Sequence, residues 1–512
     1  MWLLTAILAC DVAPPGGASS PADSSPVASS PVDSSPGEEP VEFDATYDVI
    51  VVGSGPAGAA AAIEAEAAGA SVILFERETT PGFGVRLAGQ ALGVDTIWQA
   101  EVGAVDSLEL AQADWLAVTG VEGTRESVTA YLTASNDVLL WLESRGVTIR
   151  GPSGAAPEGH INRSHTLLWP GGASPYEVLT AGTSFIERLG VEVTGPVLSD
   201  GEVVGVTWRD VVTGETGATG ARGGVVVATG GFLRNREAVE EVRPELSALG
   251  PVYETQPSST GGGLPFFEAV GAGRDEPQNI GVYLHAVPDP RHPDGEAMIL
   301  MSGPSYILVD ARGQRFTEKM DPGAYAVIEN LPDSGVWLVA GVDGATGLVF
   351  SPPAFNWTTE GLPEVYTVGD LQALGSDAVV IDSDLTTAAV VMGLDPAVVE
   401  TVEAYNAVAA SSQLDEFGAS LAPSDVVEGP KWAVVQIRPG LAKNFGGVLT
   451  DSSSRVLAPD GTPIPGIWAA GECVGMIPGG GSGAGFSGSA SALYHGGRLA
   501  GAGAAARSLS AP

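Results

Sequence analysis

The chain has 512 residues, a hydrophobic content of 44% and a formal net charge of −39 at pH 7. This length and composition are typical of a globular α/β protein with two folded units and exclude a disordered chain. The 62 acidic residues against 23 basic ones exclude nucleic acid as a partner, because phosphate binding needs clustered Lys and Arg. Two cysteines provide no disulfide framework and no zinc or iron–sulfur ligand set.

The amino terminus, residues 1–46, differs from the rest of the chain. Its apolar run MWLLTAILAC resembles the lipobox of bacterial lipoproteins, in which Cys10 would carry a lipid anchor. A Pro/Ser/Ala/Asp tract follows and is suited to a flexible tether. We therefore expect an exported lipoprotein, periplasmic or at the cell surface, with no contact to membrane except through the anchor. No Lys or Arg precedes Arg77, although signal peptides begin with positive charge, so a misassigned start codon and a cytoplasmic protein are the alternative.

Residues 47–77 carry the first chemical motif. An apolar run enters GSGPAG, an alanine-rich helical stretch follows, and a second apolar run ends at Glu76. Strand, tight turn, helix and strand in this order are typical of dinucleotide binding. Gly53 permits the turn, Gly55 lets the backbone approach a pyrophosphate, Gly58 lets the helix pack on the strand, and Glu76 can accept hydrogen bonds from a ribose. The motif does not distinguish NAD from FAD, but its place at the start of so long a chain favours FAD.

Further motifs follow in order, and together they resemble those of the succinate dehydrogenase and fumarate reductase flavoprotein family. This family includes the flavocytochrome-type fumarate reductases, urocanate reductase and the 3-ketosteroid Δ1-dehydrogenases. The resemblance extends from about Tyr47 to about Ala504. The segments that carry it are GGVVVATGGFLRN from residue 223, STGGGLPFFEAVGA from 259, GQRF from 313, ETVEAYN from 400, and GGVLTDSSSRVLAPDGTPIPGIWAAGE from 446.

The resemblance implies an α/β fold in which a Rossmann-like FAD-binding domain is assembled from both chain ends. An α+β capping domain is inserted between the two parts. On this sequence the FAD-binding domain would comprise 47–287 and 430–508, and the capping domain 288–429. The segment ETVEAYN would lie on a helix of the capping domain, where its apolar spacing is that of any packed helix and indicates no chemistry.

The resemblance also implies which residues contact FAD. Glu472 would contact the ribityl chain, and a helix start near Ser489 would lie at the flavin ring. The glycine-rich stretch 479–490 would then be backbone against the flavin, whereas its composition alone would equally suit a flexible linker. Attachment should be noncovalent, because 78–93 contains no histidine. The implied contacts are Gly53, Ser54, Gly55, Ala57, Gly58, Glu76, Arg77, Gly89, Gln90, Val197, Ala228, Thr229, Gly230, Glu472, Ser489, Ala490 and Ser491.

The residues that bind dicarboxylates in this family do not carry over. The two substrate histidines fall on Val287 and Ala442, the substrate arginine falls on Gly485, and no arginine occurs in 341–345. A charged dicarboxylate needs paired cationic donors, and losing one desolvated partner costs about 2–5 kcal/mol. We therefore exclude fumarate and succinate as substrates. The tyrosine that ketosteroid dehydrogenases place before a GPG-like turn falls on Gly481, so that chemistry is not supported either.

The remaining chemistry is that of the flavin. We expect hydride exchange between flavin N5 and an activated C–C bond of a non-dicarboxylate organic molecule, with a proton delivered by the protein. Lys443 and Tyr325 are the catalytic candidates, although each also suits an ordinary packing role, as does His285. No CxxCH motif occurs, so the electron donor or acceptor must be another molecule. A flavin oxidase or carrier-coupled dehydrogenase is one alternative, and a lipoprotein that holds FAD only as a scaffold is another.

Overall fold

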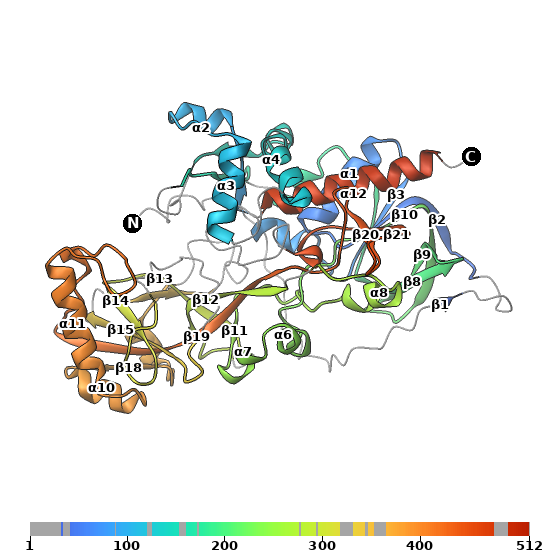
Figure 1. The fold of residues 1–512 in the computed structure, drawn as a ribbon. Coiled ribbons are helices and arrows are strands. Elements are labelled where there is room, and N and C mark those ends of the chain that lie inside the picture. Colours follow the sequence, from blue (N-terminus) through green and yellow to red (C-terminus); the bar gives the residue numbers. More distant parts are fainter. Residues whose placement is uncertain are drawn as a thin grey trace.

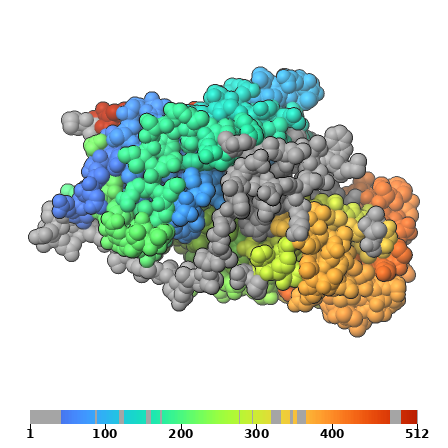
Figure 2. All heavy atoms as spheres, turned by 180° about the vertical axis from the view of Figure 1, so that it is seen from behind, coloured from blue at the N-terminus to red at the C-terminus, as the bar shows by residue number. Residues whose placement is uncertain are grey.

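Two large mixed sheets form opposite ends of the molecule (Figure 1). The computed structural model describes residues 32–33, 41–87, 89–119, 125–152, 160–171, 174–275, 278–292, 295–317, 331–343, 347–352, 365–475 and 490–510. Figure 2 shows the same division on the surface, where the blue and green residues of the first sheet lie at one end and the orange residues at the other. No helix within these ranges is both long and apolar enough to cross a membrane.

The first sheet joins the two ends of the chain. Its order is β1-β8-β9-β10-β2-β3-β7, and β21 pairs with both β10 and β20. The long strand β10 is central, because Val226 pairs in parallel with Val51 of β2 on one side and with Trp468 of β21 on the other. The strands are β1 (Val32–Asp33), β2 (Ala45–Val52), β3 (Val72–Glu76), β7 (Ile186–Leu189), β8 (Val191–Ser199), β9 (Glu202–Asp210), β10 (Thr216–Val227), β20 (Arg455–Leu457) and β21 (Pro463–Ala469).

This sheet confirms the fold class expected from the sequence. The strands predicted around GSGPAG are β2 and β3, in which Val49–Val52 and Val72–Phe75 are buried, as in a parallel sheet covered by helices. Strand β1 lies within the segment expected to be a tether, and it pairs with β8 at Val197. The rest of 1–40, including Cys10, lies outside the described residues.

Two helices from opposite chain ends cover this sheet. Helix α12 (Ala490–Ser510) lies beside α1 (Pro56–Ala67), as Figure 1 shows in red and blue. A Cβ atom at Gly497 would lie 2.1 Å from the carbonyl oxygen of Ala57, and one at Gly501 would lie 2.1 Å from that of Ala61. The glycines therefore let the two backbones touch, which explains why this layer is built from small residues.

The second sheet has the order β14-β15-β19-β12-β13-β16-β17, with β11 and β18 also paired to β19. Apolar side chains of α10 and α11 pack on one face with Val339 and Val434, and a separate core containing Leu338 and Val435 fills the other. The strands are β11 (Val252–Tyr253), β12 (Asn279–Pro288), β13 (Ala297–Ser302), β14 (Tyr306–Val309), β15 (Val336–Val342), β16 (Val349–Ser351), β17 (Tyr366–Thr367), β18 (Val379–Asp382) and β19 (Lys431–Phe445).

The second sheet extends beyond the limits expected for the capping domain. The sheet includes β11, β12 and β19, which lie at or beyond the limits 288–429 expected for the capping domain. The segment ETVEAYN lies on helix α11 (Val398–Ala410), as predicted. The exact boundaries of the domain remain a prediction, because strands on both sides of each limit belong to the same sheet.

A third, small sheet and the remaining helices complete the fold. A small sheet of β4 (Gln90–Leu92), β6 (Ser164–Leu168) and β5 (Thr148–Arg150) packs against helices in a core around Trp115, Leu139 and Tyr494. The other helices are α2 (Ile97–Glu101), α3 (Leu108–Thr119), α4 (Glu126–Ser144), α5 (Pro175–Leu179), α6 (Arg236–Val242), α7 (Pro244–Ala248), α8 (Leu264–Ala269), α9 (Val368–Ala373), α10 (Leu385–Val391), η2 (Phe83–Leu87), η4 (Pro423–Asp425) and η5 (Glu472–Val474).

Candidate functional site

The turn between β2 and α1 brings bare backbone to the surface of a cavity. Gly53 has φ of +100°, and a Cβ there would lie 2.4 Å from the Ala228 carbonyl oxygen. A Cβ at Gly58 would lie 1.8 Å from the Gly53 carbonyl oxygen, so this glycine closes the turn against the helix. A Cβ at Gly55 would meet nothing within 4 Å, because this residue faces open space at the start of α1. The turn thus offers a helix amino terminus with room for an anionic group.

The end of β3 is tied to this turn by a carboxylate. Glu76 Oε2 accepts hydrogen bonds from the Ser54 backbone N–H, at 2.9 Å, and from the Ser54 hydroxyl, at 2.5 Å. Its Oε1 accepts from the backbone N–H of Glu78 at 2.9 Å. Beside it, Arg77 donates to the Thr260 hydroxyl at 3.0 Å. This end of the site therefore combines an acceptor and a guanidinium donor, the groups that suit a ribose and an adenosine.

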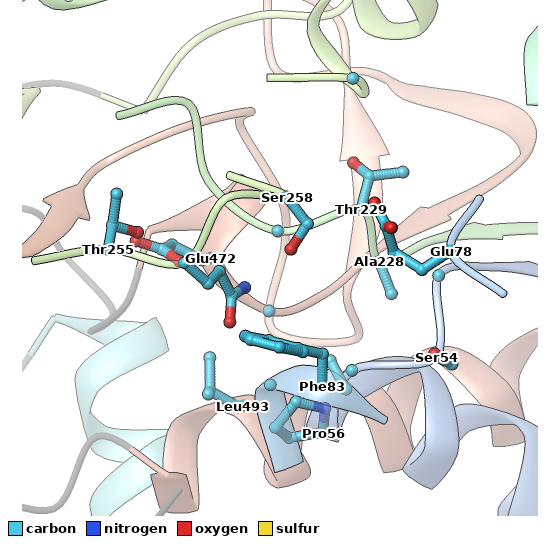
Figure 3. Close-up of a pocket in the computed structure, with 18 of the residues that line it drawn as sticks. Ser54, Pro56, Glu78, Phe83, Ala228, Thr229, Thr255, Ser258, Glu472 and Leu493 are labelled. Carbon is cyan, nitrogen blue, oxygen red and sulfur yellow. The ribbon is translucent and has the colours of Figure 1, made fainter. Parts of the chain in front are cut away.

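A cavity of about 460 Å³ runs from this turn to the second sheet. In Figure 3 Pro56, Phe83 and Leu493 lie on one side of the cavity, and Thr255, Ser258 and Glu472 lie on the opposite side. Its size is within the range of small-molecule and cofactor sites. The residues expected to bind the cofactor or act in catalysis that line it are Gly53, Ser54, Gly55, Ala57, Glu76, Arg77, Gly89, Gln90, Ala228, Thr229, Gly230, Lys443, Glu472 and Ala490.

Three other expected contacts lie outside this lining. Gly58 packs inside the turn, as described above. Val197 lies on β8 opposite Gly205, whereas the cavity is lined by Val191–Val193 at the beginning of the same strand. Ser491 is buried, and its hydroxyl donates to the Leu92 carbonyl oxygen at 2.6 Å. Ser489 and Tyr325 lie outside the described residues, as does most of the glycine-rich stretch.

Lys443 and Glu472 are two titratable residues at the end of the cavity away from the turn, and burial shifts the pKa of each. Burial raises the pKa of Glu472 to about 7, although the Asn444 N–H, 3.2 Å from Oε1, and the Lys443 charge oppose this. Burial also lowers the pKa of Lys443, and the Glu472 carboxylate opposes that change. Both groups therefore lie closer to neutral pH than they would in water, which suits proton transfer.

A bulge in β19 brings Lys443 to the cavity. Gly281 of β12 pairs with Lys443 and the next residue, Val282, pairs with Leu441, so Ala442 is an extra residue on β19. Such bulges re-aim side chains and are frequent beside active sites. As a result Ala442 and Lys443, adjacent in sequence, both line the cavity.

Several lining residues were missed by the sequence analysis. The segment around 254–262 contributes Glu254, Thr255 and Gln256, and β12 and β13 contribute Tyr283 and Ile299. The motif STGGGL overlaps the first of these segments and was a signal that its neighbours lie near the cofactor. Nothing in the local sequence marks Tyr283 or Ile299, because an apolar strand has the same residue pattern whether or not it lines a cavity.

The lining is poor in cations. Among the described lining residues the carboxylates are Glu76, Glu78, Glu192, Glu254 and Glu472, and the cations are Arg77 and Lys443. Arg77 lies at the turn, at the opposite end from Lys443. Val287, at the position of a substrate histidine in the family, is fully buried in the core of the second sheet. The described lining thus presents no cation pair for a dicarboxylate.

The donor set fits FAD rather than a metal. The glycine cradle with open space at Gly55 suits a pyrophosphate, and the buried Thr229 hydroxyl beside it has no hydrogen-bond partner among the described residues. Within those residues no group of three or more His, Cys, Asp and Glu side chains is arranged to hold a metal ion. The cavity continues past the turn for a further ring system, as a flavin dinucleotide requires.

Comparisons with known proteins agree with this cavity. The model of the FAD binding domain family matches residues 48–487. The NADH:fumarate oxidoreductase of Klebsiella pneumoniae is 28% identical over 449 residues, which is 85% of this chain but 45% of that protein. The fumarate reductase (cytochrome) of Shewanella frigidimarina is 28% identical over 459 residues, 85% of this chain and 73% of that protein.

A solved structure shows the same fold around a steroid. The 3-ketosteroid-Δ4-(5α)-dehydrogenase from Rhodococcus jostii, in complex with 4-androstene-3,17-dione, is 26% identical with a TM-score of 0.66, and the match covers 91% of this chain and 98% of that one. The family match spans most of the chain, and the cavity has the cradle that FAD requires. The chain therefore belongs to the FAD binding domain family, with the fumarate reductase and ketosteroid dehydrogenase flavoproteins, and its cofactor is FAD.

Proposed function

We propose that the protein is an FAD-dependent oxidoreductase acting on an activated C–C bond of an organic substrate that is not a dicarboxylate. The observation that carries this proposal is the single cavity that links the glycine turn to Lys443 and Glu472 and presents no cation pair among its described lining residues. When bound, FAD would supply the hydride chemistry between its N5 atom and a substrate carbon. The protein would bind and orient the cofactor and the substrate, and it would supply the proton.

The residues divide this work along the cavity. The turn at Gly53–Gly58, with Glu76 and Arg77, would hold the dinucleotide, noncovalently. Lys443 would deliver or accept the substrate proton, because burial lowers its pKa towards the range in which an amine exchanges protons. The Glu472 carboxylate would partly stabilise the positive charge of Lys443, because it opposes the lowering of the Lys443 pKa. Tyr325 remains a second candidate for the proton donor.

Relatives with other named activities support a substrate outside the dicarboxylates. The urocanate reductase of Eggerthella lenta is 27% identical over 447 residues, and the vinyl phenol reductase of Lactiplantibacillus plantarum is 27% identical over 473 residues. Their names describe the reduction of two unlike molecules, urocanate and a vinyl phenol. We infer that the present chain likewise acts on an organic acceptor or donor that is not a dicarboxylate, with a separate electron partner, and that it is exported and anchored through Cys10.

Anaerobic reoxidation tests the proposal. The full chain, purified with FAD, is reduced by light and mixed with fumarate, urocanate, an enone or a ketosteroid while the flavin absorbance is followed. We expect at least one neutral acceptor to reoxidise the flavin rapidly and fumarate to be inert. Rapid reoxidation by fumarate would contradict the exclusion of dicarboxylates. Inertness towards every acceptor, including oxygen and quinones, would instead leave FAD with only a scaffold role.

A further inference from the structure

Glu254 is a buried carboxylate at the end of the cavity near the second sheet. It follows strand β11, and its backbone N–H donates to the Leu441 carbonyl oxygen at 3.0 Å, which anchors it to β19. Its side chain is 3% exposed and lines the cavity together with Tyr283 and Lys443. Glu254 is therefore fixed by the backbone of the strand that also carries Lys443.

Among the described residues, only one oxygen of this carboxylate has a hydrogen-bond partner. Oε2 lies 3.2 Å from Nε2 of His285, whose side chain is 8% exposed. An ionised carboxylate only accepts hydrogen bonds, so the His285 Nε2–H is the donor. Oε1 is buried, and none of the described residues donates to it. A buried polar atom of this kind costs free energy unless a bound molecule supplies the missing hydrogen bond.

The surrounding strands are adapted to this arrangement. A Cβ at Gly440 would lie 1.7 Å from Glu254 Oε1, so a larger residue there would displace the carboxylate from its present position. Pro439 of β19 has no backbone N–H to donate to β12. Between the pairs Tyr283–Gly440 and Ala286–Arg438, β12 has two residues and β19 has one. His285 lies in this irregular segment of β12. The Tyr283 ring lies 5.2 Å from the His285 ring. Backbone and side chains thus hold His285 against Glu254.

We propose that Glu254, held in position by His285, is the group that selects the substrate of this enzyme, and that the substrate is a neutral molecule with a hydroxyl group bound to Glu254 Oε1. The inference rests on the proposed function and adds the substrate class to it. The hydroxyl satisfies the open oxygen, whereas an ether cannot donate and leaves it unpaired. A carboxylate at the same place would meet like charge and is rejected.

A matched set of probes tests the proposal with the FAD-loaded full chain. The probes are enones that differ at one position of a phenyl ring: 4-hydroxybenzalacetone, its methyl ether and its 4-carboxylate analogue. Binding to the oxidised protein is titrated through the change in flavin absorbance, and reoxidation of the light-reduced protein is followed separately. We expect the hydroxyl probe to bind about tenfold or more tightly than the ether, and the carboxylate probe to bind weakest.

Three variants locate the preference. Glu254→Ala should reduce the ratio of ether to hydroxyl dissociation constants to within about threefold of unity, because no acceptor remains. Gly440→Ala should act in the same direction by displacing the carboxylate. The matched control is Glu296→Gln, because Glu296 is a half-buried glutamate that pairs with Arg234 outside the cavity lining and has one oxygen with no partner among the described residues. It should leave the ratio unchanged. All variants should retain FAD.

The outcomes separate the inference from the proposed function. Equal binding of ether and hydroxyl probes, a preference that survives Glu254→Ala, or no binding of any probe overturns the role of Glu254. Reoxidation by a neutral enone in those same experiments leaves the proposed function intact. Selective binding that Glu254→Ala abolishes, with no reoxidation by any acceptor, overturns the oxidoreductase and leaves Glu254 as a binding group.

Discussion

The two ends of the cavity are built in different ways. At the turn end, backbone geometry does the work, because Gly53, Gly55 and Gly58 each occupy a position where a Cβ would collide with backbone or fill the cavity. At the end near the second sheet, side chains form the cavity wall, and they come from β12, β13, β19 and the segment that follows β11. The glycines at the first end should tolerate almost no substitution, whereas the second end should tolerate substitution but change its chemistry.

The largest effect should come from Gly58→Ala at the turn end. The added Cβ would lie 1.8 Å from a backbone oxygen that cannot move aside, so we expect a loss of about 3 kcal/mol in the free energy of unfolding, at the top of the range for overpacking. Urea denaturation of the FAD-free protein measures this loss. Gly55→Ala is the matched control, because its Cβ meets open space.

Gly55→Ala should keep the stability within about 0.5 kcal/mol but weaken FAD binding about tenfold, since the methyl group occupies the place of the ligand. Two variants with equal losses of stability would show that the turn is only a structural element.

Lys443→Met tests the opposite end. We expect the rate of substrate turnover to fall by about 10²- to 10⁴-fold, because a group that transfers the proton is lost, while the dissociation constant of FAD changes little. Reoxidation kinetics and FAD titration on the same preparation measure the two quantities. Unchanged turnover would assign the proton to another group, such as Tyr325.

A pH dependence of stability should reveal Glu472. Its pKa of about 7 in the folded protein lies above the ordinary value of 4.5, so the folded state retains a proton that the unfolded state releases. The free energy of unfolding should therefore fall as pH rises through this window, and Glu472→Gln should remove that part of the slope. Denaturation of the FAD-free protein at pH 5 and pH 8 measures it, and Glu296→Gln should keep the slope of the unmodified protein.

The smallest effect should come from Arg77→Gln. The Arg77 side chain is 32% exposed, so its hydrogen bond to Thr260 competes with water. We expect FAD binding to weaken by about threefold, as measured by the fluorescence of released FAD. A loss of affinity for FAD of a hundredfold or more would mean that side chains, and not only backbone groups, determine FAD binding at the turn end.

The same contrast explains what the sequence could predict. The strands β2 and β3, the turn and the assembly of the sheet from both chain ends could be predicted, because glycine at fixed spacing has few structural explanations. Glu254, Tyr283 and Ile299 could not, because they reach the cavity only through the register of β19 with β11 and β12 and of β12 with β13. Lys443 was identified from its place beside a substituted histidine, whereas the bulge that turns it to the cavity has no local signal. Val197 lies outside the described lining, which includes residues four to six positions earlier on the same strand, so its contact with the cofactor stays a prediction.

Strand β10 also has a consequence for synthesis. Its residues Val225–Val227 pair with β21, which follows almost 240 residues later in the chain. During translation, one side of this strand is an open row of amides and carbonyls bordered by valine, the kind of edge that recruits stray strands. The nascent chain therefore depends on late arrival of its own carboxyl-terminal segment, and a ribosome stalled before Pro463 would release an aggregation-prone fragment.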